Sequence, residues 1–231
     1  IELSLLLSQD QDTVDRPLSF WTPIMELREL FKFEFFYAAR PLFSSKIEAD
    51  LQLFQEPDQL SLYDHRLNFR QLVAQQKVRV APVVLAPYLE AYQVVIQGLQ
   101  LLDTEYPFDE NNFIESCLTL GGELQWKGKI KRAAAISRPF LINGLRLARH
   151  LDLIPNAETP KTTELLALEQ QIALFSQTIQ EIHDLDSATQ AQNTDDIPME
   201  RAIVPGSRSF DISQEILNGP KGAHIAAFFD L

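Results

Sequence analysis

The side chains that could carry catalysis or hold a metal are few and far apart in this sequence. Its four histidines are His65, His150, His183 and His224, and no two of them are close enough to form a metal-binding pair on one helix. The single cysteine, Cys117, has no histidine near it in sequence and lies in an apolar helical segment, which favours a buried, inert thiol over a nucleophile. The residues therefore predict no metal, no cofactor and no self-contained active site.

The most distinctive charge pattern is a basic stretch. Residues 127–149 hold seven Lys or Arg and no Asp or Glu, within a chain whose formal net charge is −12. Cations without neighbouring acids attract phosphate groups or anionic lipid, and this stretch is a candidate for such a contact. The predicted contact residues are Lys127, Lys129, Arg146 and Arg149.

The alternative is that these cations are neutralised within the protein, because residues 151–231 hold 4 Lys or Arg against 13 Asp or Glu. Nucleic acid is not an expected partner, since the whole chain is acidic and the basic stretch lacks a recognisable binding motif. One cysteine excludes an internal disulfide and suits a reducing compartment. No apolar run reaches the ~18–20 residues that a membrane-spanning helix needs. The chain starts with Ile, which suggests a fragment or a processed product.

The elements that must position these residues are predicted to be helices throughout. Residues 30–43, "LFKFEFFYAARPLF", contain six aromatic rings. Their alternation resembles a strand, but apolar residues from Ile24 to Ala38 recur at helical spacing, so a helix is predicted over 22–39, with Pro23 in its first turn. Three rings lie off the main apolar stripe and are expected either in a core or against lipid: Phe33, Phe36 and Tyr37.

The remaining pattern predicts an all-α fold, an irregular helical domain of about seven to nine helices. Further helices are expected from Pro41, around 67–77, over a buried central segment 88–102, over 108–121 with Asp109 as cap and Gly121-Gly122 as stop signal, and over 137–150.

The longest predicted helix runs from Thr159-Pro160 to about Leu185. Six apolar residues repeat along it with spacings of three and four and form an apolar seam: Leu165, Leu168, Ile172, Phe175, Ile179 and Ile182. An internal core is the favoured partner of this seam, and a helix of another protein is the alternative. Residues 1–185 are expected to form one helical domain, with 1–8 as the end of a helix. Residues 186–231 are expected to form an acidic linker and a tail that packs back on the domain.

Four segments in this order resemble the C-terminal region of PlsB-type glycerol-3-phosphate 1-O-acyltransferases of bacteria and mycobacteria. They are "FKFEFFYAARPLF…IEADL", "VAPYLEAYQVV", "GGELQWKGKIKRAAAISRPFLINGLRLARHLDLI" and "GPKGAHIAAFFDL". The resemblance implies an enzyme that transfers a fatty acyl group from acyl-CoA or acyl carrier protein to glycerol 3-phosphate, peripherally bound at the cytoplasmic face of the cell membrane. It also implies that the acyltransferase domain of the same enzyme is a partner.

The family's catalytic motif, His-x-x-x-x-Asp, is absent from this sequence. The fifth residues after the four histidines are Arg70, Pro155, Ala188 and Phe229. No catalytic residue can therefore be assigned, and the chain is predicted to be a non-catalytic C-terminal part that is inactive alone. The alternatives are an independent helical interaction module and an acyl-chain-binding protein.

Overall fold

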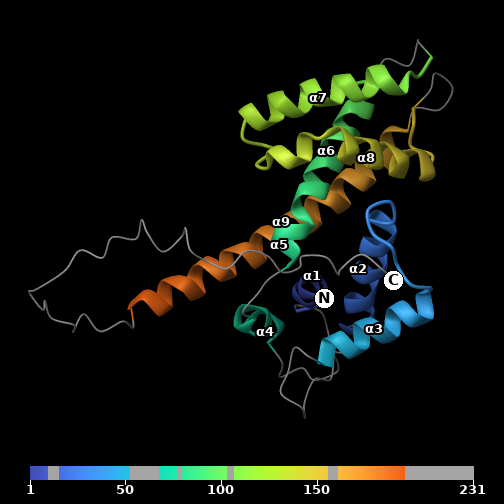
Figure 1. Ribbon diagram of the computed structural model, residues 1–231. Helices are drawn as coiled ribbons and strands as arrows, with labels where there is room; N and C mark the ends of the chain where they lie inside the picture. Colours follow the sequence, from blue (N-terminus) through green and yellow to red (C-terminus); the bar gives the residue numbers. More distant parts are fainter. Residues whose placement is uncertain (10–15, 53–67, 77–79, 103–106, 156–160, 196–231) are drawn as a thin grey trace, which may run out of the picture. The chain divides into compact units, whose positions relative to one another are not determined.

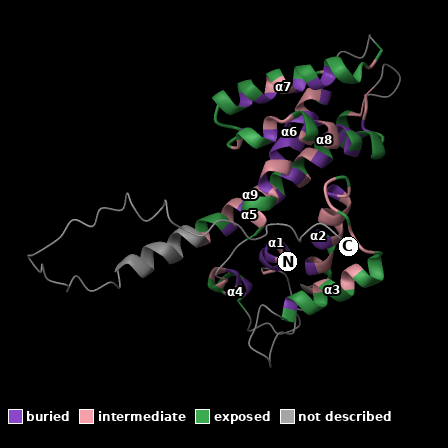
Figure 2. Cartoon of the chain, in the orientation of Figure 1, coloured by how far each residue is buried: buried purple, intermediate pink, exposed green. Residues whose placement is uncertain are grey.

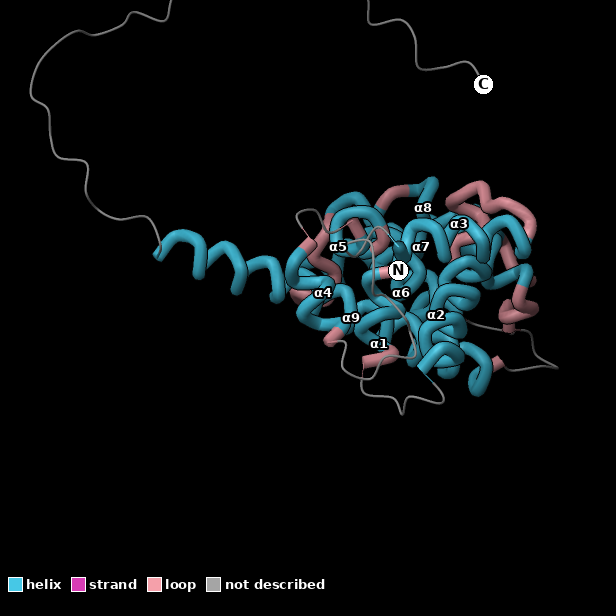
Figure 3. Tube along the Cα trace, turned by 90° about the horizontal axis from the view of Figure 1, so that it is seen from below, coloured by secondary structure: helices cyan, strands magenta, loops and turns pink. Residues whose placement is uncertain are grey.

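The computed structural model describes residues 1–9, 16–52, 68–76, 80–102, 107–155 and 161–195 of the chain. The chain divides into two units, Ile1–Thr194 and Asp195–Leu231. All regular structure in the described residues is helical, which confirms the all-α prediction (Figures 1 and 3). The helices are α1 Glu2–Leu7, α2 Arg16–Leu30, α3 Arg40–Gln52, α4 Phe69–Gln75, α5 Ala81–Val84, α6 Ala86–Gln100, α7 Glu110–Trp126, the 3-10 helix η1 Ala133–Ile136, α8 Arg138–His150 and α9 Thr162–Asp195.

The helix α6 is the centre of the core, as its apolar residues on all sides predict. It packs against α5, α7, η1 and α8, and most of its residues are buried (Figure 2). The crossing with α8 is close: a Cβ built at Gly144 would lie 3.0 Å from both Tyr92 and Val95. Glycine at this position therefore lets the two helices approach.

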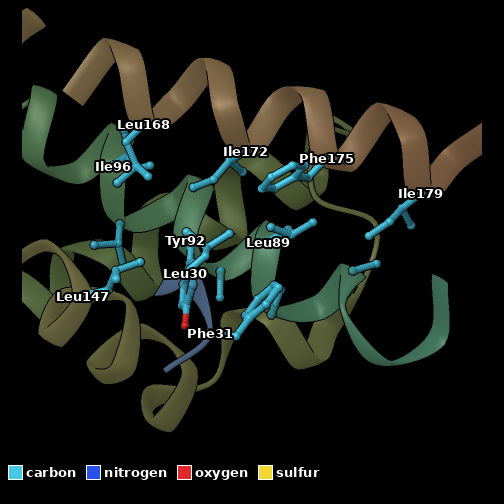
Figure 4. Close-up of a cluster of buried hydrophobic side chains, with 14 of the residues drawn as sticks. Leu30, Phe31, Leu89, Tyr92, Ile96, Leu147, Leu168, Ile172, Phe175 and Ile179 are labelled. Carbon is cyan, nitrogen blue, oxygen red and sulfur yellow. The ribbon is translucent and has the colours of Figure 1, made fainter. Parts of the chain in front are cut away.

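The apolar seam of α9 is buried against the same core. Each of its six residues is at most 8% exposed. Figure 4 shows Leu168, Ile172 and Phe175 directed toward side chains of the core cluster that includes residues of α6. The prediction of an internal core is confirmed, and the seam offers no free surface to a partner helix. Residues 159–160, predicted as the start of this helix, lie outside the described residues.

Helix α9 continues to Asp195 instead of ending near Leu185. Residues 186–195, expected to begin the linker, are therefore helical. The residues from 196 onward lie outside the described part of the chain, and the packing of a C-terminal tail on the domain stays a prediction.

The predicted helix over 22–39 was wrong at both ends. Helix α2 begins at Arg16, with Pro17 in its first turn and Pro23 in its interior, and it ends at Leu30. The chain then turns, with the amides of Glu34 and Phe35 donating to the Phe31 carbonyl at 3.0 and 3.1 Å. Residues 36–39 belong to no helix or strand, so the strand alternative was also wrong. The turn places aromatic rings against α6, and this packing overrides the helical period.

The helix α7 was predicted to stop at Gly121-Gly122, but it continues to Trp126. A Cβ built at Gly121 would lie 2.9 Å from Cγ2 of Ile136, so this glycine permits close packing on η1. The actual stop is Gly128, whose φ of +72° lies in the left-handed region that favours glycine. The predicted cap is confirmed, because Asp109 accepts the Asn112 amide at 2.9 Å.

Candidate functional site

The aromatic segment forms a ring cluster between the turn after α2 and helices α6 and α8. Phe31 lies 5.9 Å from Tyr92 between ring centroids, and Phe35 packs edge-on to Tyr88 at 5.4 Å. Tyr88 in turn lies 4.4 Å from Phe140 of α8. Phe31 and Phe35 are therefore core rather than lipid-facing residues, and aromatic pairs at these separations stabilise beyond their buried area.

A carboxylate lies beside this ring cluster. Glu34 accepts hydrogen bonds from the Tyr92 hydroxyl and from Nδ2 of Asn143, both at 2.9 Å. Burial raises the pKa of Glu34, and the two hydrogen bonds oppose that rise only in part. The pKa of Tyr92 is likewise raised, by burial and by the Glu34 charge. This arrangement joins three segments of the chain through side-chain hydrogen bonds, so we assign it to structure.

The three rings singled out by the sequence fall into different environments. Phe36 is fully exposed, and Phe33 is 37% exposed with its ring edge-on to His150. Tyr37 is half-buried beneath the Arg28 guanidinium, which lies 5.7 Å from the ring centre. Burial raises the pKa of Tyr37 to about 12. Only Phe33 and Phe36 remain available for a contact outside the chain.

The four predicted contact cations do not form one site. Lys127 pairs with Glu123 at 3.6 Å, and Arg149 pairs with Glu110 at 2.8 Å. Glu110 is the first residue of α7, whereas Lys127 follows its last residue, and a helix of 17 residues is ~25 Å long. Among the described residues, the acids that pair with the basic stretch belong to α6 and α7. The acids from residue 196 onward lie outside the described part of the chain, so their pairing with the basic stretch stays a prediction.

The remaining two predicted cations have no carboxylate partner in the described part of the chain. Arg146 donates to the amide oxygen of Asn143 at 3.2 Å. Lys129 lies in the loop after α7 and lines a pocket of about 240 Å³, together with Lys131 and Arg132. We call this the basic pocket; its other walls are α6, including Glu90, and α9 between Ser176 and His183.

Glu90 organises the basic pocket. Its carboxylate accepts the backbone amides of Lys131 and Arg132 at 3.2 and 2.9 Å, and Nη1 of Arg132 donates to it at 2.7 Å. The Glu90 side chain is only 11% exposed, so these charge-assisted bonds hold the loop firmly on α6. Lys131 extends to α9, where its Nζ donates to Oε1 of Gln180 at 2.9 Å.

The cationic groups that line the basic pocket are suited to binding an anion. The His183 imidazole lies 3.6 Å from the Asp184 carboxylate, which is too long for a hydrogen bond, and both side chains are exposed. Sequence reasoning missed Glu90, Lys131 and Arg132 as site residues. The acid-free stretch could have indicated Lys131 and Arg132. Their partners on α6 and α9 are distant in sequence, so the pocket that they form together could not be recognised.

The described residues contain no group of three or more His, Cys, Asp or Glu that could hold a metal ion. None of their helices is long and apolar enough to cross a membrane.

The described residues thus form an all-helical domain with a cationic pocket between α6, α9 and the loop after α7. The chain belongs to the family described as "Glycerol-3-phosphate acyltransferase C-terminal region", which matches residues 3–157. It is similar to the protein named "Putative acyltransferase plsB1" of Mycobacterium bovis and of two strains of Mycobacterium tuberculosis, with 29% identity over 174 residues in each case.

These alignments cover 74% of this chain but 27% of each mycobacterial relative, so the chain spans about a quarter of the length of the curated proteins it matches. The family resemblance expected from the sequence is thereby confirmed. No solved structure matches the chain.

Proposed function

We propose that this chain is the non-catalytic helical part of a glycerol-3-phosphate 1-O-acyltransferase and that it packs against the catalytic domain of the same enzyme. The enzyme would transfer a fatty acyl group from acyl-CoA or acyl carrier protein to the position-1 hydroxyl of glycerol 3-phosphate. The observation that carries this proposal is the family match over residues 3–157. The similarity to mycobacterial proteins named as putative acyltransferases supports it.

The residues of this chain suggest that the catalytic base would come from the catalytic domain and not from this chain. Acyl transfer to a hydroxyl needs a base that removes its proton in the transition state. The sequence contains no His-x-x-x-x-Asp motif, the pattern expected to supply such a base in this family. The chain would contribute a rigid helical surface, held by the buried core of α6 and α9, against which the catalytic domain is positioned.

An activity assay tests this proposal directly. The purified 231-residue chain is incubated with glycerol 3-phosphate and acyl-CoA, beside a complete mycobacterial relative as positive control. We expect no acylated product above the rate without protein. Turnover comparable to that of the complete relative would show that the chain carries its own catalytic residues and would overturn the proposal.

We further propose that the enzyme is peripheral to the membrane at its cytoplasmic face and that this chain contributes a weak contact. The proposal is supported by the exposed rings of Phe33 and Phe36, because aromatic side chains favour the membrane interface. Lys32 lies beside Phe33, with its Nζ 5.6 Å from the centre of that ring, but it also pairs with Glu29 at 3.6 Å, so the rings would carry most of the contact.

A further inference from the structure

We propose that the basic pocket binds a phosphate group, carried either by a small soluble phosphorylated molecule or by a lipid headgroup. The proposal rests on the residues that line this pocket and does not depend on the proposed function. Among the described residues that line it, three side chains are cationic, Lys129, Lys131 and Arg132, and Glu90 supplies the one carboxylate.

Glu90 does not compete with an incoming phosphate. Its carboxylate already accepts three hydrogen bonds from the loop, two from backbone amides and one from Arg132. It therefore neutralises one of the three cations and fixes the loop, leaving two lysines to act on a ligand. A loop that is already ordered loses little conformational freedom when an anion binds.

These two lysines differ from most of the basic stretch. Lys127, Arg138 and Arg149 each pair with a glutamate of α7. Lys131 instead contacts the neutral amide of Gln180, and the ammonium group of Lys129 has no hydrogen-bonded or ion-paired partner among the described residues. The two lysines of the loop that pair with no carboxylate among the described residues are thus the two that line the pocket.

The size and remaining lining of the pocket suit a phosphate group. Its volume of about 240 Å³ is many times the ~10–15 Å³ that a single bound water requires. Ser176, Gln177 and Gln93 add neutral hydrogen-bonding groups to the cationic wall. A phosphate oxygen accepts charge-assisted hydrogen bonds from lysines, and neutral donors can satisfy the oxygens that the lysines do not reach.

Isothermal titration calorimetry of the whole chain with inorganic phosphate and with glycerol 3-phosphate tests the soluble source. We expect Lys129→Gln and Lys131→Gln each to weaken binding about tenfold, as loss of a hydrogen bond to a charged group predicts. Lys127→Gln is the matched control, because it removes the same charge two residues away but outside the pocket lining. Equal urea denaturation curves establish that the three variants are folded.

Vesicle binding tests the lipid source. Sedimentation with phosphatidylglycerol vesicles, compared with phosphatidylcholine vesicles, should show a loss of binding in the Lys129→Gln/Lys131→Gln double variant that Lys127→Gln does not show. Phosphate binding without this vesicle effect identifies a soluble ligand, and the reverse identifies a headgroup; both support the proposal. It is overturned if neither probe binds, or if Lys127→Gln weakens binding as much as the pocket variants do.

Discussion

Glu34 is a half-buried carboxyl that accepts hydrogen bonds from two neutral donors, the Tyr92 hydroxyl and the Asn143 amide. Desolvation without a compensating cation favours the protonated form, which is why its pKa lies above the ordinary value of 4.5. The folded state consequently binds this proton more tightly than the unfolded state does. The contribution of Glu34 to stability is fully present at low pH and is lost as pH rises from about 4.5 through the raised pKa.

We predict that Glu34→Gln, whose side chain has the same size but carries no charge, removes the decrease in stability that Glu34 causes as pH rises. Urea denaturation at a series of pH values should show the free energy of unfolding shifting in favour of the variant as pH rises from about 4.5 toward 7. Glu34→Ala is the companion variant, because it leaves Tyr92 and Asn143 without their partner and should cost ~1–3 kcal/mol at any pH in this range. Parallel pH profiles for wild type and Glu34→Gln would contradict the prediction.

At the scale of elements, the adjacent glycines of α7 have opposite surroundings. A Cβ at Gly121 would meet Ile136 of η1 at 2.9 Å, whereas a Cβ at Gly122 would have no neighbouring atom within 4 Å. The first glycine is buried and the second is exposed. Substitutions at these two positions therefore distinguish two effects of a glycine: the close packing that it permits, and the free-energy cost of a glycine within a helix.

We predict that Gly122→Ala stabilises the chain by ~0.5–1 kcal/mol, because alanine has the higher helix propensity and no contact is disturbed. Gly121→Ala gains the same propensity but forces Ile136 to shift, and overpacking of this kind costs ~1–3 kcal/mol. Thermal or urea denaturation measures both variants, each serving as the control for the other. Equal shifts in the two free energies of unfolding would show that α7 is not held closely on η1.

The sequence allowed accurate prediction where the pattern within one segment decides the structure. The seam from Leu165 to Ile182, the buried helix α6 and the Asp109 cap all follow from local spacing or hydrogen bonding. The prediction was wrong at the end of α2 and at Gly121, because contacts with α6 and η1 determine the backbone conformation there. The basic pocket could not be predicted either, since Glu90 and Gln180 lie far in sequence from the loop they bind.

At the scale of the whole molecule, the charge of the basic stretch is largely compensated within the described residues. Glutamates of α6 and α7 pair with Lys127, Arg132, Arg138 and Arg149. Exposed ion pairs of this kind present little net charge to a distant surface, and salt screens what remains over ~8 Å. Any membrane contact of this chain should therefore depend more on exposed rings than on the stretch as a whole.

We predict that the chain binds phosphatidylglycerol vesicles weakly and that Phe33→Ala/Phe36→Ala weakens binding about tenfold at every salt concentration. Binding of the unmodified chain should also decrease with added salt, because the cations contribute a screened attraction. Cosedimentation measures both effects. Leu101→Ala/Leu174→Ala, which removes two other exposed apolar side chains, is the matched control. Equal effects of the two double variants, or no effect of either, would exclude the rings as the membrane contact.

The burial of Cys117 makes the contact between α6 and α7 accessible to chemical labelling kinetics. Its sulfur lies 2.9 Å from the Cβ position of Gly98 on α6, and burial raises the pKa of the thiol to about 12. A thiol reagent can react only when α7 separates from α6, because the thiol is otherwise covered and protonated. The sequence has no second cysteine, so all labelling reports on this one site. The labelling rate of the folded chain divided by that of the unfolded chain gives the equilibrium constant for this opening, and hence its free energy.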